Sequence, residues 1–122
     1  MTPRIDTFNA EVFDHLLARY GALPTDPLPQ RWLLLEAAHV VGQTRIGPHL
    51  RSHMAMLGLA WETGDRAEIG GQLFRLALVP LGHLLRRLPH GNSGRAHISA
   101  FQPMQPSSEI LQVISQSRQK RL

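Results

Sequence analysis

The sequence predicts an all-α protein, a compact bundle of about four to five helices. Leucine is abundant, whereas valine, isoleucine, threonine and tyrosine are sparse and never alternate with polar residues for long, so helices are favoured over strands. Glycine and proline separate the segments in which apolar side chains recur at helical spacing. The 122 residues suit one domain, and we expect a single helical domain over residues 1–122 with loose ends at 1–6 and 116–122.

The first two predicted helices lie on either side of a proline-rich loop. An apolar side chain recurs every four residues over about residues 7–20, and Gly21 supplies a stop. In the loop, Asp26 followed by Pro27 can cap the next helix, because proline suits the first helical position. That second helix, about residues 28–42, is apolar almost all round, which predicts burial on several sides.

The third and fourth predicted helices form a hairpin. The third covers about residues 48–63, and Gly64 ends it. Asp65, with Glu68 three residues later, is typical of a capping box that opens a fourth helix. We expect that fourth helix to continue to about Val79.

Proline interrupts the rest of the chain. Pro80 predicts a kink or a break, followed by a shorter helical piece to Leu88. Residues 89–106 are rich in turn-forming residues and predict an irregular loop. Ser107 or Ser108 then caps a last amphipathic helix.

One stretch suggests how the helices are paired. Residues 57–80 resemble a tetratricopeptide unit, with a helix, a Gly-Asp turn, a second helix and then a proline. The chain has room for two such hairpins, fewer than the three or so repeats that a solenoid needs. We therefore expect a compact bundle of tetratricopeptide-like hairpins.

Composition excludes several classes of protein. With no cysteine, the chain cannot form a disulfide framework, a thiolate zinc finger or an iron–sulfur site. No apolar run approaches the ~20 residues of a membrane span. Asp6, Glu11 and Asp14 stand where a secretory signal needs a basic start and an apolar run. We expect a cytoplasmic protein with no membrane partner.

The residues that can carry chemistry lie in the second and third predicted helices. Glu36 and His39 are three apart, and His49 and His53 are four apart, so each pair shares one helix face. If the chain reverses near residues 44–47, His39 lies between the levels of His49 and His53, with Glu36 near His53. Three imidazoles and a carboxylate suit Zn²⁺, and also Fe²⁺, Ni²⁺ or Cu²⁺. We predict that these four residues bind a divalent transition metal, with Zn²⁺ favoured.

Three further side chains can support such a site. Gln43 lies one turn beyond the Glu36 stripe, and Met56 extends the histidine stripe with a thioether that suits Cu(I). His83 can take a fourth position if the fourth helix folds back. A di-iron centre is not expected, because the Glu-x-x-His pair occurs once and such centres need it twice.

A plainer interpretation of the same residues remains open. Histidines at the edge of an apolar stripe are often structural, hydrogen-bonded to a carbonyl or a carboxylate. Glu36 would then pair with His39, Arg45 or Arg51.

Other chemistry finds little support. The chain has no P-loop and no nucleophile elbow. Nothing in it supplies an evident general base, so we predict that it is not an enzyme. No helix-turn-helix or aromatic-stacking pattern is present, so a nucleic-acid partner is not expected. The segment from Gly91 to Arg95 is either an anion-binding nest or a plain turn.

The alternative function is a protein–protein interaction module of the tetratricopeptide type. The histidines would then be structural, and the basic second half, including Arg86 and Arg87, would hold a partner. A homo-oligomer formed through the apolar helices fits either function.

Several motifs also resemble a bacterial family known as domain of unknown function 3703. They are LEAAHVVGQ with GPHLRSHMAML, then GQLFRLALVPLGHLLRRLP and GNSGRAHISAFQPM, and the resemblance covers about residues 8–106. The family label carries no activity. The resemblance implies a link to metal homeostasis or resistance, because such genes can lie beside heavy-metal efflux and sensing genes. It also implies that the GNSGRAHISAFQPM segment matters, and it marks as candidates Glu36, His39, His49, His53 and His83.

Overall fold

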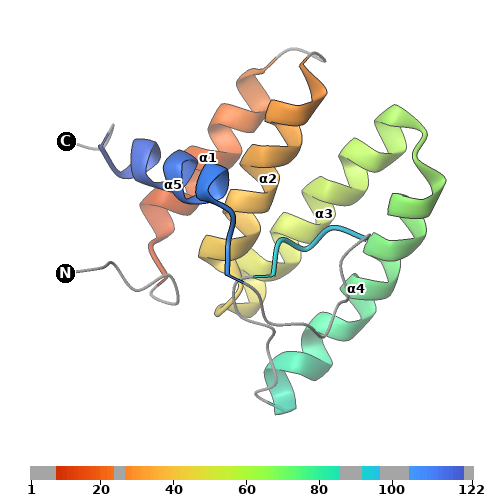
Figure 1. Cartoon of the computed structure of the whole chain (residues 1–122). Helices are drawn as coiled ribbons and strands as arrows, with labels where there is room; N and C mark the ends of the chain where they lie inside the picture. The colour runs from red at the N-terminus through yellow and green to blue at the C-terminus, as the bar shows by residue number, and fades with distance from the viewer. Residues whose placement is uncertain (1–7, 24–26, 86–91, 97–104, 120–122) are drawn as a thin grey trace.

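Five α-helices make up the structure, a computed structural model that describes residues 8–23, 27–85, 92–96 and 105–119. These residues contain no strand, so the all-α prediction is confirmed. Helices α1 to α4 run alternately up and down, and α5 packs on α1 and α2 (Figure 1). In chain order the helices are α1 (Ala10–Ala22), α2 (Leu28–Gly42), α3 (Ile46–Thr63), α4 (Arg66–Leu85) and α5 (Ser108–Gln119).

Helix α2 lies at the centre of the bundle. It packs against α1 and α5 on one side and against α3 on the other, and 10 of its 15 residues are buried. This confirms the burial that its all-round apolar pattern predicts. At its end, Gly42 allows α1 to approach closely, because a Cβ atom there would lie 2.8 Å from Phe13 Cε2. The two core clusters that meet α2 include Val12, Phe13, Leu16, Val113 and Ile114 on one side, and Met56, Leu59 and Ala60 on the other.

The turn between α3 and α4 follows from its sequence. Gly64 has the left-handed φ of 69° that ends many helices, and its N–H bonds the last turn of α3. The N–H of Glu68 donates to Asp65 Oδ1 at 3.1 Å, so Asp65 caps α4 as predicted. The carboxylate of Glu68 takes no part in this cap. Instead it accepts hydrogen bonds from Arg95 and Ala96, which lie far along the chain.

Helix α4 continues through Pro80 to Leu85, so the predicted break is wrong. A proline inside a helix leaves the carbonyl four residues earlier without its usual donor, which here is the carbonyl of Leu76. Because Pro80 is exposed, water can solvate that region. The predicted extension to Leu88 lies outside the described residues.

Helix ends differ from the predictions by a few residues. Helix α1 begins at Ala10, where Asn9 Oδ1 accepts from the N–H of Val12 at 3.1 Å, and it continues past Gly21. Helix α2 has Pro27 at its N-cap without a side-chain cap, and Asp26 lies outside the described residues. Helix α3 begins at Ile46, two residues before the prediction.

The last helix is longer than expected. Ser107 Oγ accepts from the N–H of Ile110 at 3.2 Å, which confirms one of the two predicted caps. Residues 116–119, part of the predicted loose end, form the last turn of α5. Ser117 is fully buried there and accepts a hydrogen bond from Arg19 Nη1 at 3.1 Å. This contact with α1 explains why the helix persists. Residues 1–6 and 120–122 lie outside the described residues.

No helix in the described part of the chain combines the length and the apolar character needed to cross a membrane.

Candidate metal centre

Three histidines from two helices meet inside the bundle. His39 comes from α2, and His49 and His53 come from successive turns of α3. The three ring centroids lie 4.7 to 5.0 Å apart, and one ligand nitrogen from each residue lies within 4.8 Å of the others. Each residue is at most 5% exposed. The antiparallel hairpin of α2 and α3 therefore brings together the three predicted imidazoles.

The outer nitrogen of His39 is held by the backbone. His39 Nδ1 lies 2.7 Å from the carbonyl oxygen of Asn92. A carbonyl can only accept, so His39 Nδ1 carries the proton and donates it to this bond. In the neutral ring, Nε2 then has a free lone pair, which is the form that binds a metal.

A side-chain amide holds His53 in the same way. His53 Nδ1 lies 2.7 Å from Gln72 Oε1. The orientation of this amide is set by its other end, because Gln72 Nε2 donates to Glu68 Oε2 and to the carbonyl of Gly94, both at 2.8 Å. His53 Nδ1 is therefore the donor, and its Nε2 also has a free lone pair.

His49 connects the cluster to α4. Its Nε2 lies 3.2 Å from His39 Nε2, and its Nδ1 lies 2.9 Å from His83 Nε2. Because His39 Nε2 accepts, His49 Nε2 donates in the metal-free protein and His49 Nδ1 accepts from His83. A tetrahedral Zn²⁺ with Zn–N bonds of about 2.0–2.1 Å keeps its nitrogens about 3.3 Å apart, close to the spacing of His39 and His49.

Burial keeps the three imidazoles neutral. It is the largest cause of the lowered pKa of His49, about 3, with further lowering by His53 and His83. Burial also lowers the pKa of His53 to about 4, although the bond to Gln72 opposes the change. The pKa of His39 is well below its usual value, first through burial and then through its two histidine neighbours. At neutral pH all three rings are therefore uncharged, and each has one unprotonated nitrogen.

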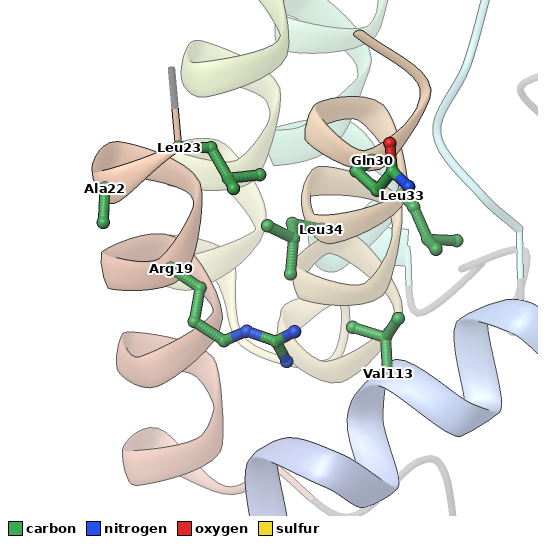
Figure 2. A pocket seen from close by; sticks show the side chains of 7 residues that line it. All are labelled: Arg19, Ala22, Leu23, Gln30, Leu33, Leu34 and Val113. Carbon is green, nitrogen blue, oxygen red and sulfur yellow. The ribbon is translucent and has the colours of Figure 1, made fainter. Parts of the chain in front are cut away.

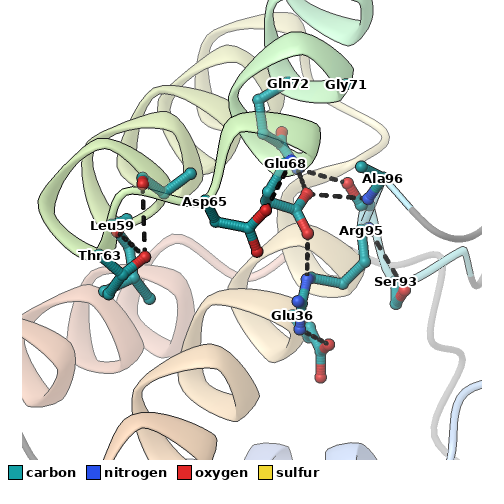
Figure 3. Close-up of polar contacts among 12 residues, drawn as sticks. Glu36, Leu59, Thr63, Asp65, Glu68, Gly71, Gln72, Ser93, Arg95 and Ala96 are labelled. Carbon is teal, nitrogen blue, oxygen red and sulfur yellow. Dashed lines mark hydrogen bonds and ion pairs between the residues drawn. The ribbon is translucent and has the colours of Figure 1, made fainter.

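The segment 92–96 crosses the cluster and ties it to α4. Arg95 Nε donates to Glu68 Oε1 at 2.6 Å, and the N–H of Ala96 donates to Glu68 Oε2 at 2.8 Å (Figure 3). Gly94 lies against the His39 ring, where a Cβ atom would be 2.8 Å from Cδ2, and its φ is 86°. This segment is the described part of the stretch expected to be an anion nest or a turn. The cation of this segment, the Arg95 guanidinium, is already paired with carboxylates.

Glu36, the fourth predicted ligand, is not in the histidine group. Its Oε1 lies 3.4 Å from Arg95 Nη1. The Arg95 guanidinium also covers the ring of Trp32, 3.8 Å from its centroid, and so bridges α2 and α4. Burial raises the pKa of Glu36, while Arg95 opposes this increase. The structure therefore places Glu36 beside Arg95, which lies 59 residues away in the sequence, and its role as a ligand stays a prediction.

Comparison with known families matches residues 9–114 to a family described as "Protein of unknown function (DUF3703)". The chain belongs to this family. All four predicted ligands and the segment 92–96 lie inside the matched region. No curated protein and no solved structure matches this DUF3703 chain. The tetratricopeptide-like arrangement of its hairpins stays a prediction.

The supporting residues have varied surroundings in the DUF3703 fold. His83 contacts His49 through a ring nitrogen, as a partner of a predicted ligand. Met56 is fully buried among apolar side chains of α2 and α3, which accounts for it without a metal. Gln43 is buried at the end of α2. Sequence spacing missed Gln72 and Asn92, although Gln72 lies one helical turn after Glu68.

A pocket elsewhere in this DUF3703 protein has a different character. It measures about 300 Å³ and lies between α1, α2 and α5, with a mainly apolar lining (Figure 2). Arg19 is the charged residue of its lining, and Leu34 and Val113 lie across from it. The lining contains no histidine or carboxylate, so it offers no metal ligand of these kinds.

Proposed function

We propose that this DUF3703 protein binds one divalent transition metal ion, with Zn²⁺ favoured, through Nε2 of His39, His49 and His53. The observation that carries the proposal is the convergence of three buried imidazoles that each have a partner on Nδ1. Metal-binding histidines almost always donate their second ring nitrogen to such a partner, which fixes the ring orientation and raises the basicity of the ligand atom.

Metal binding would require a change at one histidine. His49 Nε2 donates to His39 in the metal-free protein, whereas a metal needs its lone pair. The Nε2 proton of His49 would therefore leave to solvent, and His49 Nδ1 would take the proton that His83 Nε2 donates to it at 2.9 Å. His83, which is partly exposed, would take a proton from water on its Nδ1, so that its Nε2 accepts from His49 as a neutral imidazole. In this proposal His83 is a positioning residue that selects the metal-binding tautomer of His49.

The donor set favours certain ions, and the pairing of the nearby carboxylates favours a role without catalysis. Three neutral imidazoles suit Zn²⁺ and also Cu²⁺ or Ni²⁺, and they leave one position for water or another ligand. The two carboxylates of the surrounding network, Glu36 and Glu68, are both paired with Arg95 and are not free to act as bases. We therefore propose a non-enzymatic cytoplasmic protein that holds the ion, in metal homeostasis or resistance.

Calorimetric titration of ZnCl₂ into untagged, chelator-treated protein tests the proposal. We expect one Zn²⁺ per chain, and we expect His53→Ala to abolish that binding while the helical circular dichroism persists. His15→Ala is the matched control, because His15 lies on α1 outside the cluster. Glu36→Gln should retain binding, because an amide can still accept from Arg95.

Two results would contradict the proposal. If His53→Ala bound Zn²⁺ as tightly as the parent, the ion would be held elsewhere. If the parent bound none of Zn²⁺, Cu²⁺ and Ni²⁺, the histidines would be structural and the interaction module would be the better hypothesis. His83→Gln separates the positioning role, since glutamine can accept from His49 and should bind more tightly than His83→Ala, by about 10-fold or more.

A further inference from the structure

Helix α4 is turned with its polar side towards the bundle. Its buried side chains are Glu68, Gln72, Arg75 and Val79, three of which are polar or charged. Gln72 bonds His53 of α3, the helix on which α4 packs, and Glu68 bonds the segment 92–96. A surface helix of a globular protein normally buries its apolar stripe and exposes its polar one. In α4 the network around the histidines takes the inner side, so the apolar residues are left outside.

The outer side of α4 is apolar along almost its whole length. The exposed residues from position 67 to position 85 carry no charge and no polar side chain. Leu84 is 78% exposed, and the other large side chains are at least 49% exposed. Helix α4 lies at the edge of the bundle (Figure 1). We call this surface the outer face of α4, and it consists of Ala67, Gly70, Leu73, Phe74, Ala77, Pro80, Leu81, Leu84 and Leu85.

The outer face is large enough to form an interface with a copy of itself. Its five large side chains leave on the order of 500 Å² of apolar surface in water, comparable to the largest patch on a typical monomer, which is often functional. If two copies covered each other, on the order of 1,000 Å² would be buried, where specific interfaces begin.

The order of large and small residues shows how two copies fit. Gly70, Leu73, Ala77 and Leu84 follow the alternating three- and four-residue spacing of a helix–helix seam, which Pro80 completes, and Leu81 lies beside the seam. The small residues lie towards the start of α4 and at its middle, and the leucines crowd its end. An antiparallel pair centred on Ala77 places the small end of each helix against the large end of the other.

The register of that pair can be stated residue by residue. With a two-fold axis at Ala77, Gly70 faces Leu84 of the partner subunit, and Leu73 faces Leu81 of the partner subunit. Ala77 meets its own copy, which lets the two helix axes approach closely. We propose that this protein forms a two-fold symmetric dimer through the outer face of α4, with α4 antiparallel to α4 of the partner subunit.

A second copy fits this face better than a membrane does. Helices that lie on membranes pair an apolar face with a solvated face rich in lysine and arginine. In α4 the opposite side is buried against α3, and its arginine, Arg75, is 7% exposed. A symmetric interface needs only self-complementarity of shape, which the alternating sizes provide. This pairing does not depend on metal binding.

The mass in solution of the full chain is the first test, measured by light scattering after size exclusion. We expect a dimer, and we expect Leu81→Glu to weaken it at least ~100-fold, because symmetry buries the new carboxylate twice without a partner. The matched control is Leu111→Glu on α5, another exposed leucine, which should stay dimeric with unchanged helical content.

Disulfide trapping tests the register and does not require a destabilised variant. The chain has no cysteine, so Ala77→Cys introduces a single thiol at the proposed axis. Oxidation should link two copies of this variant rapidly. Arg66→Cys should not link, because 11 residues on each side of the axis hold those thiols about 33 Å apart.

Several outcomes would overturn the proposal. A monomeric parent at 100 µM or so, or a dimer that Leu81→Glu leaves intact, rules out this interface. Equal trapping of Ala77→Cys and Arg66→Cys indicates a parallel pair and contradicts the antiparallel register. A monomer that binds anionic lipid vesicles through Leu81 would assign the outer face to a membrane surface instead.

Discussion

The imidazole rings of the cluster are oriented by partners on their outer nitrogens. The carbonyl of Asn92 holds His39, and the amide of Gln72 holds His53, each at 2.7 Å. These bonds fix which nitrogen carries the proton, so the inner nitrogens of His39 and His53 point their lone pairs into the cluster. His49 differs, because its Nε2 donates to His39. The arrangement therefore has the character of a ligand set as well as of a packed cluster.

Gly94 makes the contact that brings the segment 92–96 onto His39. We expect Gly94→Ala to lower the free energy of unfolding by about 2–4 kcal/mol and to weaken Zn²⁺ binding, because the new Cβ meets the His39 ring and the φ of 86° disfavours alanine. Urea unfolding and Zn²⁺ titration measure the two effects.

Gly64→Ala is the matched control for that substitution. Gly64 also has a positive φ, 69°, but a Cβ atom there meets nothing within 4 Å. It should lose only about 1 kcal/mol, the cost of the backbone conformation, and keep its Zn²⁺ affinity. Equal effects of the two variants would show that the contact between Gly94 and His39 is unimportant.

At the scale of elements, α4 is the helix whose pattern is most easily misjudged. Its leucines suggest a core-facing stripe, yet most of them lie outside and its buried residues are mainly polar. The reason is that Glu68 and Gln72 have partners in the segment 92–96 and in His53. Hydrogen-bonded polar groups can be buried at modest cost, whereas the same groups without partners could not.

A glycine in α4, Gly71, allows the segment 92–96 to lie against the helix. At Gly71 a Cβ atom would be 2.3 Å from Ala96 Cβ and 3.2 Å from Ala96 Cα. We expect Gly71→Ala to lower the free energy of unfolding by about 1–3 kcal/mol, because the backbone of the segment must move. Urea unfolding of the metal-free protein measures this change.

A glycine in α3 gives the comparison for Gly71. Gly58 is exposed, and a Cβ atom there meets nothing within 4 Å. Gly58→Ala should therefore raise the free energy of unfolding by up to about 1 kcal/mol, through helix propensity alone. If Gly71→Ala were also stabilising, the close packing of Ala96 on α4 would be wrong.

Over the whole molecule, the buried histidines couple folding to pH. In the unfolded chain their pKa is near 6.5, whereas in the folded protein His49 and His53 have pKa values of about 3 and about 4. At a pH between the folded and the unfolded pKa values, these histidines bind protons in the unfolded chain but not in the folded protein. The free energy of unfolding of the metal-free protein should therefore fall as the pH drops below about 6.5, by up to ~1.4 kcal/mol per pH unit for each such histidine.

Urea unfolding in EDTA at pH 7.5, 6.5, 5.5 and 5.0 measures this slope. Above pH 7 the curve should be nearly flat for these groups, because both states are neutral. His53→Gln, which removes one titrating group, should make the slope shallower, and His15→Ala should not change the contribution of the cluster. A free energy of unfolding that is constant from pH 7.5 to 5.0 would contradict the burial of neutral histidines.

The sequence by itself determined the helices and the three imidazoles of the candidate site. Apolar spacing and glycine stops predicted the all-α class, and a chain reversal near residues 44–47 is the condition under which α2 and α3 pair. Spacing of three and four residues placed His39, His49 and His53 on facing sides of that hairpin, because helix periodicity and a short turn are local properties.

The tertiary structure alone decided what surrounds the imidazoles. Arg95 pairs with Glu36 across 59 residues, and Gln72 and Asn92 hold the outer nitrogens across 19 and 53 residues. Whether Pro80 ends α4 and which side of α4 faces inward also depend on such distant contacts. Local pattern cannot encode these outcomes, because each is a competition between partners that only the folded chain brings within reach.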